Sequence, residues 1–464
     1  MPAFDLLVRG GTVVRSTGSA RLDVAVRNGS IVAVEPSIPT EAAARVIDAT
    51  GLLVLPGVID VHTHTRVGSD EEPDRFFRDS VAAAHAGTTT FLAFNNPGTG
   101  ISTTAQTRLR EGVTEWLART AGDSAVDVGL SAVITAQQER PEADIADAVA
   151  RGVASFKCFL VYDFGVDEGQ LQGLLGASKR DGALLQVHGE DAAMLKAGIS
   201  EQLALGESGP LGHARSRPPL VEATGTARAI QLAAEADAPV YLVHVSSRAA
   251  QARIAAARRA GQPVFGETCP HYLALDGSRY LLPPQESITA VISPPLRSLD
   301  DQAALWVALN DGTLDLVATD HVPDRLALEK RWQGQPFPGI SNGGPGIETL
   351  LSVTYSAGVA DGRMSVERLV DVLATTPARL FGMPAKGAVE IGRDADLLLF
   401  DPAPLRVIRQ ADLHHTSDYT PYEGMAVQGA VRRVVQRGRD VVVDGSFVGS
   451  RGAGRFVQRT GPTA

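Results

Sequence analysis

The central part of the chain alternates short apolar runs with alanine-rich segments, and this alternation strongly limits the folds that it can adopt. Apolar runs of strand length include 52–60, 88–94, 153–162, 183–188, 240–244 and 314–320. Stretches with helical periodicity lie between them at 75–86, 222–236 and 248–260. Strands that alternate with helices are typical of βα units around a parallel sheet. The region has the length of eight such units, so we expect an α/β protein with a (β/α)8 TIM barrel.

The two ends of the chain resemble each other and differ from the middle. Residues 4–55 carry short β-branched runs separated by Gly-Gly, Asn-Gly and Thr-Gly, which are hairpin signals. The pattern returns after about residue 388 in AVEIGRDADLLLFDP and VRRVVQRGRDVVVDGSFV. We therefore expect a small β-sandwich domain built from residues 1–55 and 381–464, with the barrel over 56–380. The tail after about residue 450 is expected to be frayed.

Charge and composition exclude several classes of protein. The net charge is -10 with both signs interspersed, so no basic stripe for phosphates is present and no nucleic-acid partner is expected. No run approaches the roughly 18 apolar residues of a membrane span, and the start lacks the pattern of an export signal. Cys158 and Cys269 are too few for a disulfide framework. We expect a cytoplasmic protein, no membrane contact and two buried cysteines.

Potential metal ligands follow several of the predicted strands. His62 and His64 come two residues apart after one apolar run, so the alternation of a strand directs both side chains the same way. His188, His244 and Asp320 each end another run. In a barrel of parallel strands these ends meet at one mouth, where such enzymes hold their active sites. The spacing predicts a site for one or two metal ions, although Asp320 alone could instead cap a helix.

Lys157 is unusual because it lies inside the apolar run VASFKCFLVY. A buried, unpaired ammonium is costly, and one that faces divalent cations would also be repelled. Addition of CO2 to the neutral amine would give a carbamate, an anion able to bridge two metals. A lysine directed to the surface or paired with a carboxylate is an equal alternative on spacing alone.

The remaining histidines are weaker candidates for a functional role. His321 directly follows Asp320 and is expected either to support a metal ligand or to belong to a plain loop. Four others lie in helical, glycine-rich or C-terminal segments and are interpreted as structural: His85, His213, His414 and His415.

A series of motifs gives the chain a family resemblance over nearly its whole length. In order they are VLPGVIDVHTH, SFKCFLVY, LLQVHGED, VYLVHVSS, ETCPHYL, SPPLR, ATDH, SNGGPGIE, GRDADLLLFDP and DYTPYEGM. The chain resembles the cyclic amidohydrolases of the amidohydrolase superfamily, and most of all the dihydropyrimidinase/D-hydantoinase group. That family combines a metal-bearing barrel with a β-sandwich from both termini, which agrees with the organisation expected above.

The resemblance implies a binuclear metal centre. His62, His64 and Asp320 would bind the more buried ion, and His188 and His244 the second. Carboxylated Lys157 would bridge the two ions, and zinc is the expected metal. Water bound by such ions loses a proton near neutral pH and becomes a nucleophile, since its pKa falls from about 15.7 towards roughly 7.

The resemblance also implies the reaction. The metal-bridging hydroxide would open a hydantoin or dihydropyrimidine ring to an N-carbamoyl amino acid. Asp320 would take up the proton and pass it to the ring nitrogen, while the Tyr162 hydroxyl would stabilise the oxyanion. Main-chain groups of Ser293 and Asn342 would pair with the imide edge of the ring, although SNGGPG could also be a plain turn-rich loop.

Some motifs point to alternative functions. ETCPHYL and SFKCF also resemble allantoinases, and Arg66 stands where dihydroorotases bind a substrate carboxylate. Arg66 could equally be an exposed arginine, and His271 could bind a substrate carboxylate or cap a loop. A non-catalytic scaffold related to dihydropyrimidinases would have no need for the complete ligand set. A mononuclear deaminase would have no use for Lys157 as a bridge.

The resemblance suggests a homo-oligomer, either a tetramer or a dimer. The ring substituent and the preferred handedness depend on the loops at 66–75 and 158–165, so the sequence leaves them open.

Overall fold

The computed structural model describes residues 2–95 and 107–461. Its largest element is a parallel sheet in which every strand pairs with the next along the chain. The strands are β8 (Val58–Thr63), β9 (Thr88–Phe94), β10 (Asp127–Val133), β11 (Ser155–Phe159), β12 (Leu184–His188), β13 (Val240–Leu242), β14 (Val264–Thr268) and β15 (Leu316–Val317). A parallel bridge between Thr63 and His321 joins the first strand to the segment after the last. The sheet thus closes into the predicted barrel.

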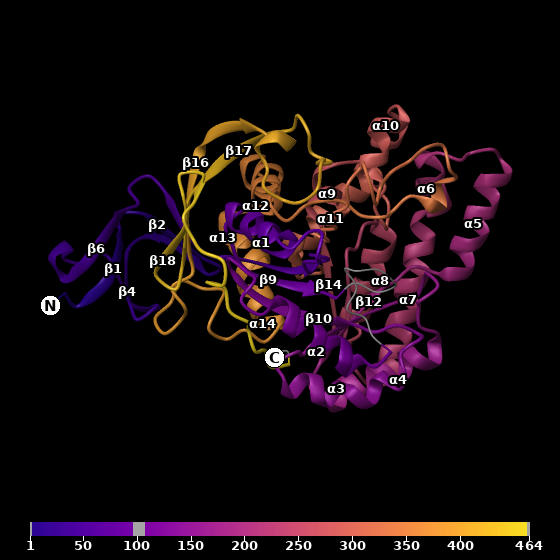
Figure 1. Cartoon of the computed structure of the whole chain (residues 1–464), viewed down its shortest axis with the longest axis horizontal. Coiled ribbons are helices and arrows are strands. Elements are labelled where there is room, and N and C mark those ends of the chain that lie inside the picture. The colour runs from indigo at the N-terminus through magenta and orange to yellow at the C-terminus, as the bar shows by residue number, and fades with distance from the viewer. Residues whose placement is uncertain (1, 96–106, 462–464) are drawn as a thin grey trace.

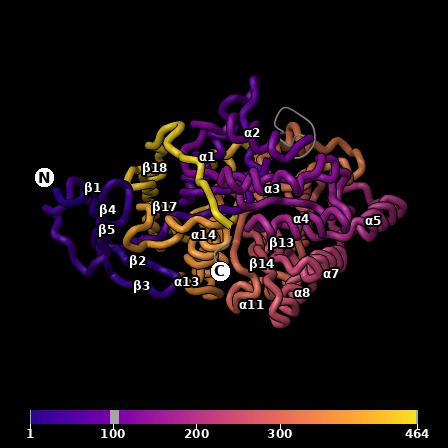
Figure 2. The backbone as a smooth tube through the Cα atoms, turned by 90° about the horizontal axis from the view of Figure 1, so that it is seen from below, coloured from indigo at the N-terminus to yellow at the C-terminus, as the bar shows by residue number. Residues whose placement is uncertain are grey.

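Helices surround the barrel, as Figures 1 and 2 show. The longer ones are α1 (Arg75–His85), α2 (Leu109–Thr120), α3 (Pro141–Ala150), α4 (Glu168–Arg180), α5 (Ala192–Ala204), α7 (Pro219–Glu235), α8 (Arg248–Arg259) and α11 (Leu299–Asp311). The shorter ones are α6 (Pro210–Ser216), α9 (Pro270–Ala274), α10 (Pro284–Ser287), α12 (Leu350–Thr354), α13 (Val366–Val370) and α14 (Thr376–Leu380). No helix within the described ranges has the length and apolarity needed to cross a membrane.

The β-domain consists of two sheets beside the barrel, at the left of Figure 1. One contains β5 (Ser30–Glu35), β4 (Asp23–Arg27), β1 (Phe4–Arg9) and β6 (Ala43–Asp48). The other contains β19 (Ser446–Phe447), β18 (Arg439–Val443), β17 (Ala426–Gln436), β16 (Leu397–Val407), β7 (Leu53–Pro56), β2 (Thr12–Arg15) and β3 (Gly18–Arg21). Antiparallel pairing of β7 with β16 joins the two ends of the chain. The expected β-domain from both termini is confirmed, while its limits at 55 and 381 stay a prediction.

The apolar run 52–60 forms two strands, so the prediction of one strand was wrong. The chain turns at Gly57, and β7 and β8 belong to different sheets. A Cβ atom at Gly57 would lie 2.1 Å from Oγ1 of Thr89 on β9. The close approach explains why glycine stands here, because a larger residue would push the first barrel strand away from its neighbour.

The C-terminal tail packs against the barrel, which contradicts the expected fraying for residues up to 461. Phe456 forms a parallel bridge with Val128 of β10. The buried Arg459 donates to Oγ of Ser155 at 2.9 Å and to the carbonyl of Leu130. The guanidinium group thus ties the tail to two neighbouring strands, and Figure 2 shows the C-terminus beside α14.

A buried ion cluster connects the barrel to the β-domain. Nζ of Lys386 lies 2.8 Å from a carboxylate oxygen of Asp127 on β10 and 2.6 Å from one of Asp396, next to β16. Asp394 lies 3.2 Å away. Burial lowers the pKa of Lys386, but Asp396 and Asp127 raise it by more, so the net shift is upward and the lysine is charged. Arg437 also pairs with Asp127, so two cations face three carboxylates, and these paired charges link the barrel to the β-domain.

We expect Lys386→Met to destabilise the protein by about 3–5 kcal/mol, because it leaves the buried Asp396 without its cation, whereas Asp127 keeps Arg437. The exposed pair of Arg432 with Asp401 offers a control, since Arg432→Met should cost less than about 1 kcal/mol. Urea unfolding followed by circular dichroism measures both variants. Equal midpoints for Lys386→Met and the wild type would contradict the prediction.

Candidate metal centre and substrate pocket

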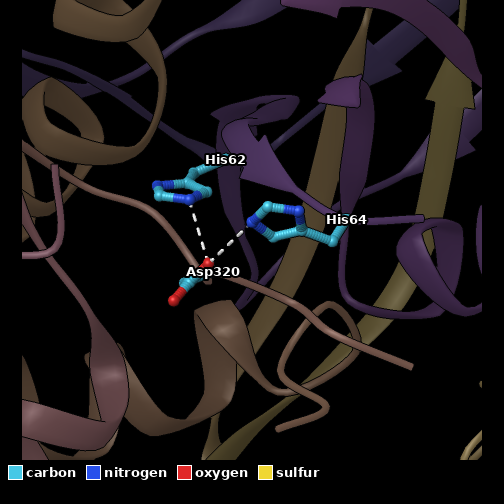
Figure 3. Close-up of side chains that lie close together, drawn as sticks. All are labelled: His62, His64 and Asp320. Atoms are coloured by element: carbon cyan, nitrogen blue, oxygen red, sulfur yellow. Dashed lines mark ion pairs between the residues drawn. The ribbon is translucent and has the colours of Figure 1, made fainter. Parts of the chain in front are cut away.

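Asp320 forms the centre of the candidate site (Figure 3). One of its carboxylate oxygens lies 2.9 Å from Nε2 of His62 and 3.3 Å from Nε2 of His64. The two histidines stand at the end of β8, while Asp320 follows β15, the last strand of the barrel. The closure of the barrel therefore brings these three residues together, and their nitrogen and oxygen atoms lie within 4.8 Å of one another.

Lys157 lies in the interior of the barrel on β11, completely buried. Its Nζ is 3.5 Å from Nε2 of His62 and 5.0 Å from the ring centroids of Phe94 and Phe159. Burial lowers the pKa of Lys157 to about 8, against the attraction of Asp320 and Glu267. More of the amine is therefore neutral near neutral pH than in a free lysine, and the neutral amine is the form that reacts with CO2.

His188 and His244 complete the candidate ligand set. His188 ends β12 and His244 follows β13, and their ring centroids are 4.5 Å apart. The ring of His244 is also 5.5 Å from that of His62. The structure thus brings together the six residues that the resemblance assigned to two metal ions: His62, His64, Lys157, His188, His244 and Asp320.

Burial keeps most of these imidazoles neutral, which is the form that binds metals. Desolvation lowers the pKa of His64 to about 4, and it also lowers the pKa values of His188 and His244. The pKa of Asp320 is well below its usual range, because the neighbouring histidines outweigh the effect of burial. The pKa of His62 is raised instead, because burial and Lys157 lower it but Glu267 and Asp320 raise it by more. A carboxylate beside three neutral imidazoles is a good donor set for a divalent transition metal.

Carboxylates that the sequence analysis did not identify hold two of the histidine rings. Glu267 on β14 accepts from Nδ1 of His62, and Glu190 pairs with Nε2 of His188 at 2.7 Å. Each leaves the other ring nitrogen for a ligand, as in the carboxylate–histidine–metal arrangement. Both glutamates stood inside quoted motifs, ETCPHYL and LLQVHGED, so the motifs contained a signal for them.

Arg217 was also missed by the sequence analysis. It is buried, pairs with Glu190 and places its guanidinium carbon 5.9 Å from the centroid of the Tyr162 ring. Desolvation raises the pKa of Tyr162, and the charge of Arg217 opposes that shift. Arg217 therefore connects a candidate metal ligand with the tyrosine, and no strand-end pattern could have identified it because it precedes a helix.

A cavity of about 310 Å³ opens in front of this cluster. Its volume lies near the lower end of the roughly 300–1,000 Å³ that is usual for small-molecule sites. It is lined by candidate ligands together with Arg66, Phe159, Tyr162, Phe164, Ser293, Val322, Ser341 and Asn342. Oγ of Ser293 and Oδ1 of Asn342 are buried and find no hydrogen-bond partner among the described residues. The cavity thus offers polar atoms that a bound molecule could satisfy.

Backbone strain gathers at this site. Tyr162, His244 and Asp320 have φ values of +71°, +40° and +50°, in the region that favours glycine. Such residues cost about 1–3 kcal/mol each and persist where the surrounding structure fixes them. These strained backbone conformations follow the ends of the strands, and all three side chains line the same cavity.

Arg66 lies at the cavity with its charge already balanced. Its guanidinium pairs with Asp324 and, at 2.6 Å, with Glu329. A substrate carboxylate would have to compete with both acids, so the environment of Arg66 offers little net positive charge. The substrate-binding role of Arg66 stays a prediction that this pairing does not favour.

The other histidines near the site have varied surroundings. The carbonyl of His321 accepts from the backbone N–H of His64 at 2.7 Å, and its Nδ1 accepts from that of Gly346 at 3.1 Å. His321 thus supports the end of β8 and the loop that carries Asn342. Nε2 of His271 is buried without a hydrogen-bond partner in the described part of the chain, and its role stays open.

These observations fit a metal centre. Buried neutral imidazoles, an ionised carboxylate and a partly neutral lysine all face one cavity. Nδ1 of His244 is buried and has no hydrogen-bond partner among the residues described. Without a cation, several of these buried nitrogen and oxygen atoms would have few partners, and burying polar atoms without partners costs free energy.

The fold and this donor set define a class of metal-dependent hydrolases, and the chain belongs to the amidohydrolase family, whose model matches residues 53–441. It is 38% identical to a D-hydantoinase of Geobacillus stearothermophilus over 98% of this chain and 96% of the relative. A D-hydantoinase of Streptomyces coelicolor is 36% identical over 98% and 97%. The crystal structure of dihydropyrimidinase from Brevibacillus agri matches with a TM-score of 0.93 and 38% identity, covering 99% of each chain.

We expect Glu267→Gln to lower metal affinity by about 10–100-fold, because the carboxylate fixes the ring of His62. Zinc retained after dialysis against a graded series of chelator concentrations measures the effect. Glu222→Gln is a matched control, since Glu222 is equally buried but binds Ser246 and Arg297 rather than a histidine. Equal zinc retention by Glu267→Gln and the control would refute the role of Glu267.

Proposed function

We propose that this protein hydrolyses the ring of a cyclic ureide, a hydantoin or a dihydropyrimidine, to an N-carbamoyl amino acid. The observation that carries the proposal is the convergence of the six candidate ligands and Tyr162 around one cavity. Full-length similarity to hydantoinases supports the same reaction.

In this proposal His62, His64 and Asp320 would hold one divalent ion, and His188 and His244 would hold a second. Lys157, once carboxylated by CO2, would provide an anionic ligand to both, and the burial that lowers its pKa favours this change. The bound ions would supply an activated water and polarise the carbonyl that it attacks. Zinc suits a donor set of imidazole and carboxylate groups.

The protein's own residues then move the protons. As the water oxygen bonds to the ring carbonyl carbon, Asp320 accepts the proton that the water loses. The C–N bond of the ring breaks, and Asp320 returns that proton to the departing nitrogen. The product is a carboxylic acid that carries the N-carbamoyl group, and it becomes a carboxylate when it releases the second proton of the water to solvent.

Tyr162 stabilises the negative charge that develops on the carbonyl oxygen. Its ring is 36% exposed, at the mouth of the cavity, and the guanidinium of Arg217 lies near it. A raised phenol pKa keeps the hydroxyl protonated, so that it can donate a hydrogen bond. Glu190 and Arg217 hold Tyr162 and His188 in one network and thereby position both.

The part of the cavity lined by Ser293 and Asn342 suits the imide edge of a ureide. Ser293 and Asn342 stand there with the loops that carry them, and a ureide displays one N–H donor between two carbonyl acceptors. Main-chain groups of these residues would pair with that edge. Arg66, already paired, leaves a dihydroorotate carboxylate without a cation of its own.

Two further proposals rest on the sequence and its family resemblance. We infer that the protein acts in the cytoplasm and that it forms a homo-oligomer, a dimer or a tetramer.

We expect metal-loaded protein to hydrolyse 5-substituted hydantoins or dihydrouracil faster than dihydroorotate, because Arg66 at the cavity is already paired with Asp324 and Glu329 and cannot readily bind a substrate carboxylate. Allantoin, which has no carboxylate, is included in the comparison. Release of the N-carbamoyl product is followed by chromatography at equal substrate concentrations. Preference for dihydroorotate would give Arg66 the substrate-binding role and overturn the proposed substrate class. Preference for allantoin would favour the allantoinase reading of ETCPHYL.

We expect Tyr162→Phe to lower kcat by about 10²–10³-fold and to change KM little, because the hydroxyl acts mainly in the transition state. Tyr355→Phe is a control, as Tyr355 packs against Phe400 in contact with the β-domain. Steady-state kinetics with equal metal content measures both. A Tyr162→Phe enzyme with wild-type kcat would show that the tyrosine only lines the cavity.

We expect Lys157→Met to lose most of its bound metal and to lower kcat/KM by at least about a thousandfold, because the bridging anion is gone. Elemental analysis of protein purified without chelator gives the metal content. Nuclear magnetic resonance after growth in ¹³C-bicarbonate should show a carbamate carbon in the wild type alone. Wild-type metal content in Lys157→Met would refute the bridge.

A further inference from the structure

A second group of potential metal ligands lies away from the cavity described above. His85 ends helix α1, Glu348 stands just before α12, and His414 belongs to the segment between β16 and β17. One nitrogen or oxygen atom from each lies within 4.8 Å of the others. All three line a cavity of about 410 Å³ whose floor includes Phe400, Val427, Val431 and Val442. The sequence analysis interpreted both histidines as structural.

The hydrogen bonds of this group are incomplete. Nδ1 of His414 lies 2.7 Å from Oε1 of Glu348, whose other oxygen accepts from the backbone N–H of His414 at 2.6 Å. Nε2 of His85 is buried but has no hydrogen-bond partner among the described residues. A donor atom without a partner beside a carboxylate and a second imidazole is the arrangement that a cation would complete.

We propose that His85, Glu348 and His414 bind a divalent transition-metal ion, separate from the catalytic centre. The ion takes the place of the proton that His414 and Glu348 share, so that Nδ1 and Oε1 become ligands. Nε2 of His85 provides the third bond, and water from the cavity fills the remaining positions. The proposal does not depend on the proposed function.

The stacked imidazoles must open slightly to bind one ion. The rings of His85 and His414 are parallel, with centroids 3.6 Å apart and an interplanar angle of 6°. One ion cannot lie in both ring planes, so one ring has to tilt. The side chain of His414 is 43% exposed and lies in a connecting segment, whereas His85 is fixed at the end of a helix. His414 is therefore the ring that moves.

The charges around the cavity decide which ions fit. Arg406 and Arg409 line it together with Glu348 and Asp412, so the formal charges cancel. A hard ion such as Mg²⁺ or Ca²⁺ needs several oxygen ligands and would gain little here. Imidazole nitrogens bind copper and zinc more strongly, so these are the ions expected.

An ion at this site would join three parts of the chain that are distant in sequence. Helix α1 belongs to the barrel, Glu348 follows the SNGGPG loop, and His414 belongs to the C-terminal part of the chain. A ligand that binds the folded state but not the unfolded state stabilises the protein. The site would therefore act as a clamp between the barrel and the C-terminal segment.

Copper added to zinc-loaded holoenzyme tests the proposal. We expect the wild type to take up one Cu²⁺ per chain with nitrogen hyperfine structure in its electron paramagnetic resonance spectrum, and its thermal midpoint to rise. In His85→Phe, which keeps an aromatic ring against His414, that signal and the midpoint shift should both be lost. Asp394→Asn is the matched control, since Asp394 belongs to a separate group of potential ligands and is already paired with Lys386.

His414→Ala provides a second variant should His85→Phe fail to fold, because its side chain is partly exposed. Identical copper uptake and spectra in wild type, folded His85→Phe and His414→Ala would overturn the proposal. Copper that exchanges into the catalytic centre is identified by loss of hydantoin hydrolysis, which copper at the new site should leave intact. Failure of the proposed function would be seen instead as zinc-loaded wild type that hydrolyses no cyclic ureide.

Discussion

The closure of the barrel at His321 is the contact on which the rest of the structure depends. Thr63 pairs with His321, and the carbonyl of His321 accepts from the backbone N–H of His64. The same backbone pairing holds Asp320 against His62 and His64. Barrel closure and assembly of the site are therefore one event, and neither could be altered without the other. The positive φ of Asp320 shows that the backbone accepts strain at this junction.

The buried charges at this junction are tolerated because an acidic group lies beside basic ones. Asp320, Lys157 and His62 lie within a few ångströms in a space with little solvent, where an unpaired charge would be expensive. The neighbouring histidines keep the carboxylate ionised, and burial makes the lysine easier to deprotonate. The same electrostatic balance that permits folding thus prepares anionic and neutral donors for cations.

Much of the fold could be predicted from hydrophobic patterning. The strand at 88–94 and the helix near 75–86 agree closely with β9 and α1, because the strand is one continuous buried run and the helix has a clear apolar period. The pattern did not single out β10 or β14, whose runs contain Asp127 and Glu267 among the apolar residues. The break at Gly57 was also missed, although Pro56-Gly57 is a turn signal. The approach of Thr89 that requires glycine there is a tertiary contact, which the sequence does not show.

The metal-ligand candidates could be predicted because strand ends impose their position. The residues that hold them could not, since Glu190, Glu267 and Arg217 act through contacts between distant segments. The period and spacing of residues in the sequence indicate the structure of a single strand or helix, but not its contacts with other elements. The positions of partner residues follow from how the strands are ordered around the barrel, which no single segment encodes.

The C-terminal segment shows how such distant contacts serve the mouth of the barrel. The Tyr419 hydroxyl donates to the carbonyl of Gly343, the residue after Asn342, at 3.2 Å. Oγ of Ser417 donates to the carbonyl of Asp324, whose side chain holds Arg66. The motif DYTPYEGM and the serine that precedes it therefore support the loops on either side of the cavity, although they lie far from the candidate ligands in sequence. Among the described residues, this C-terminal segment thereby supports a pocket to which it contributes no lining residue.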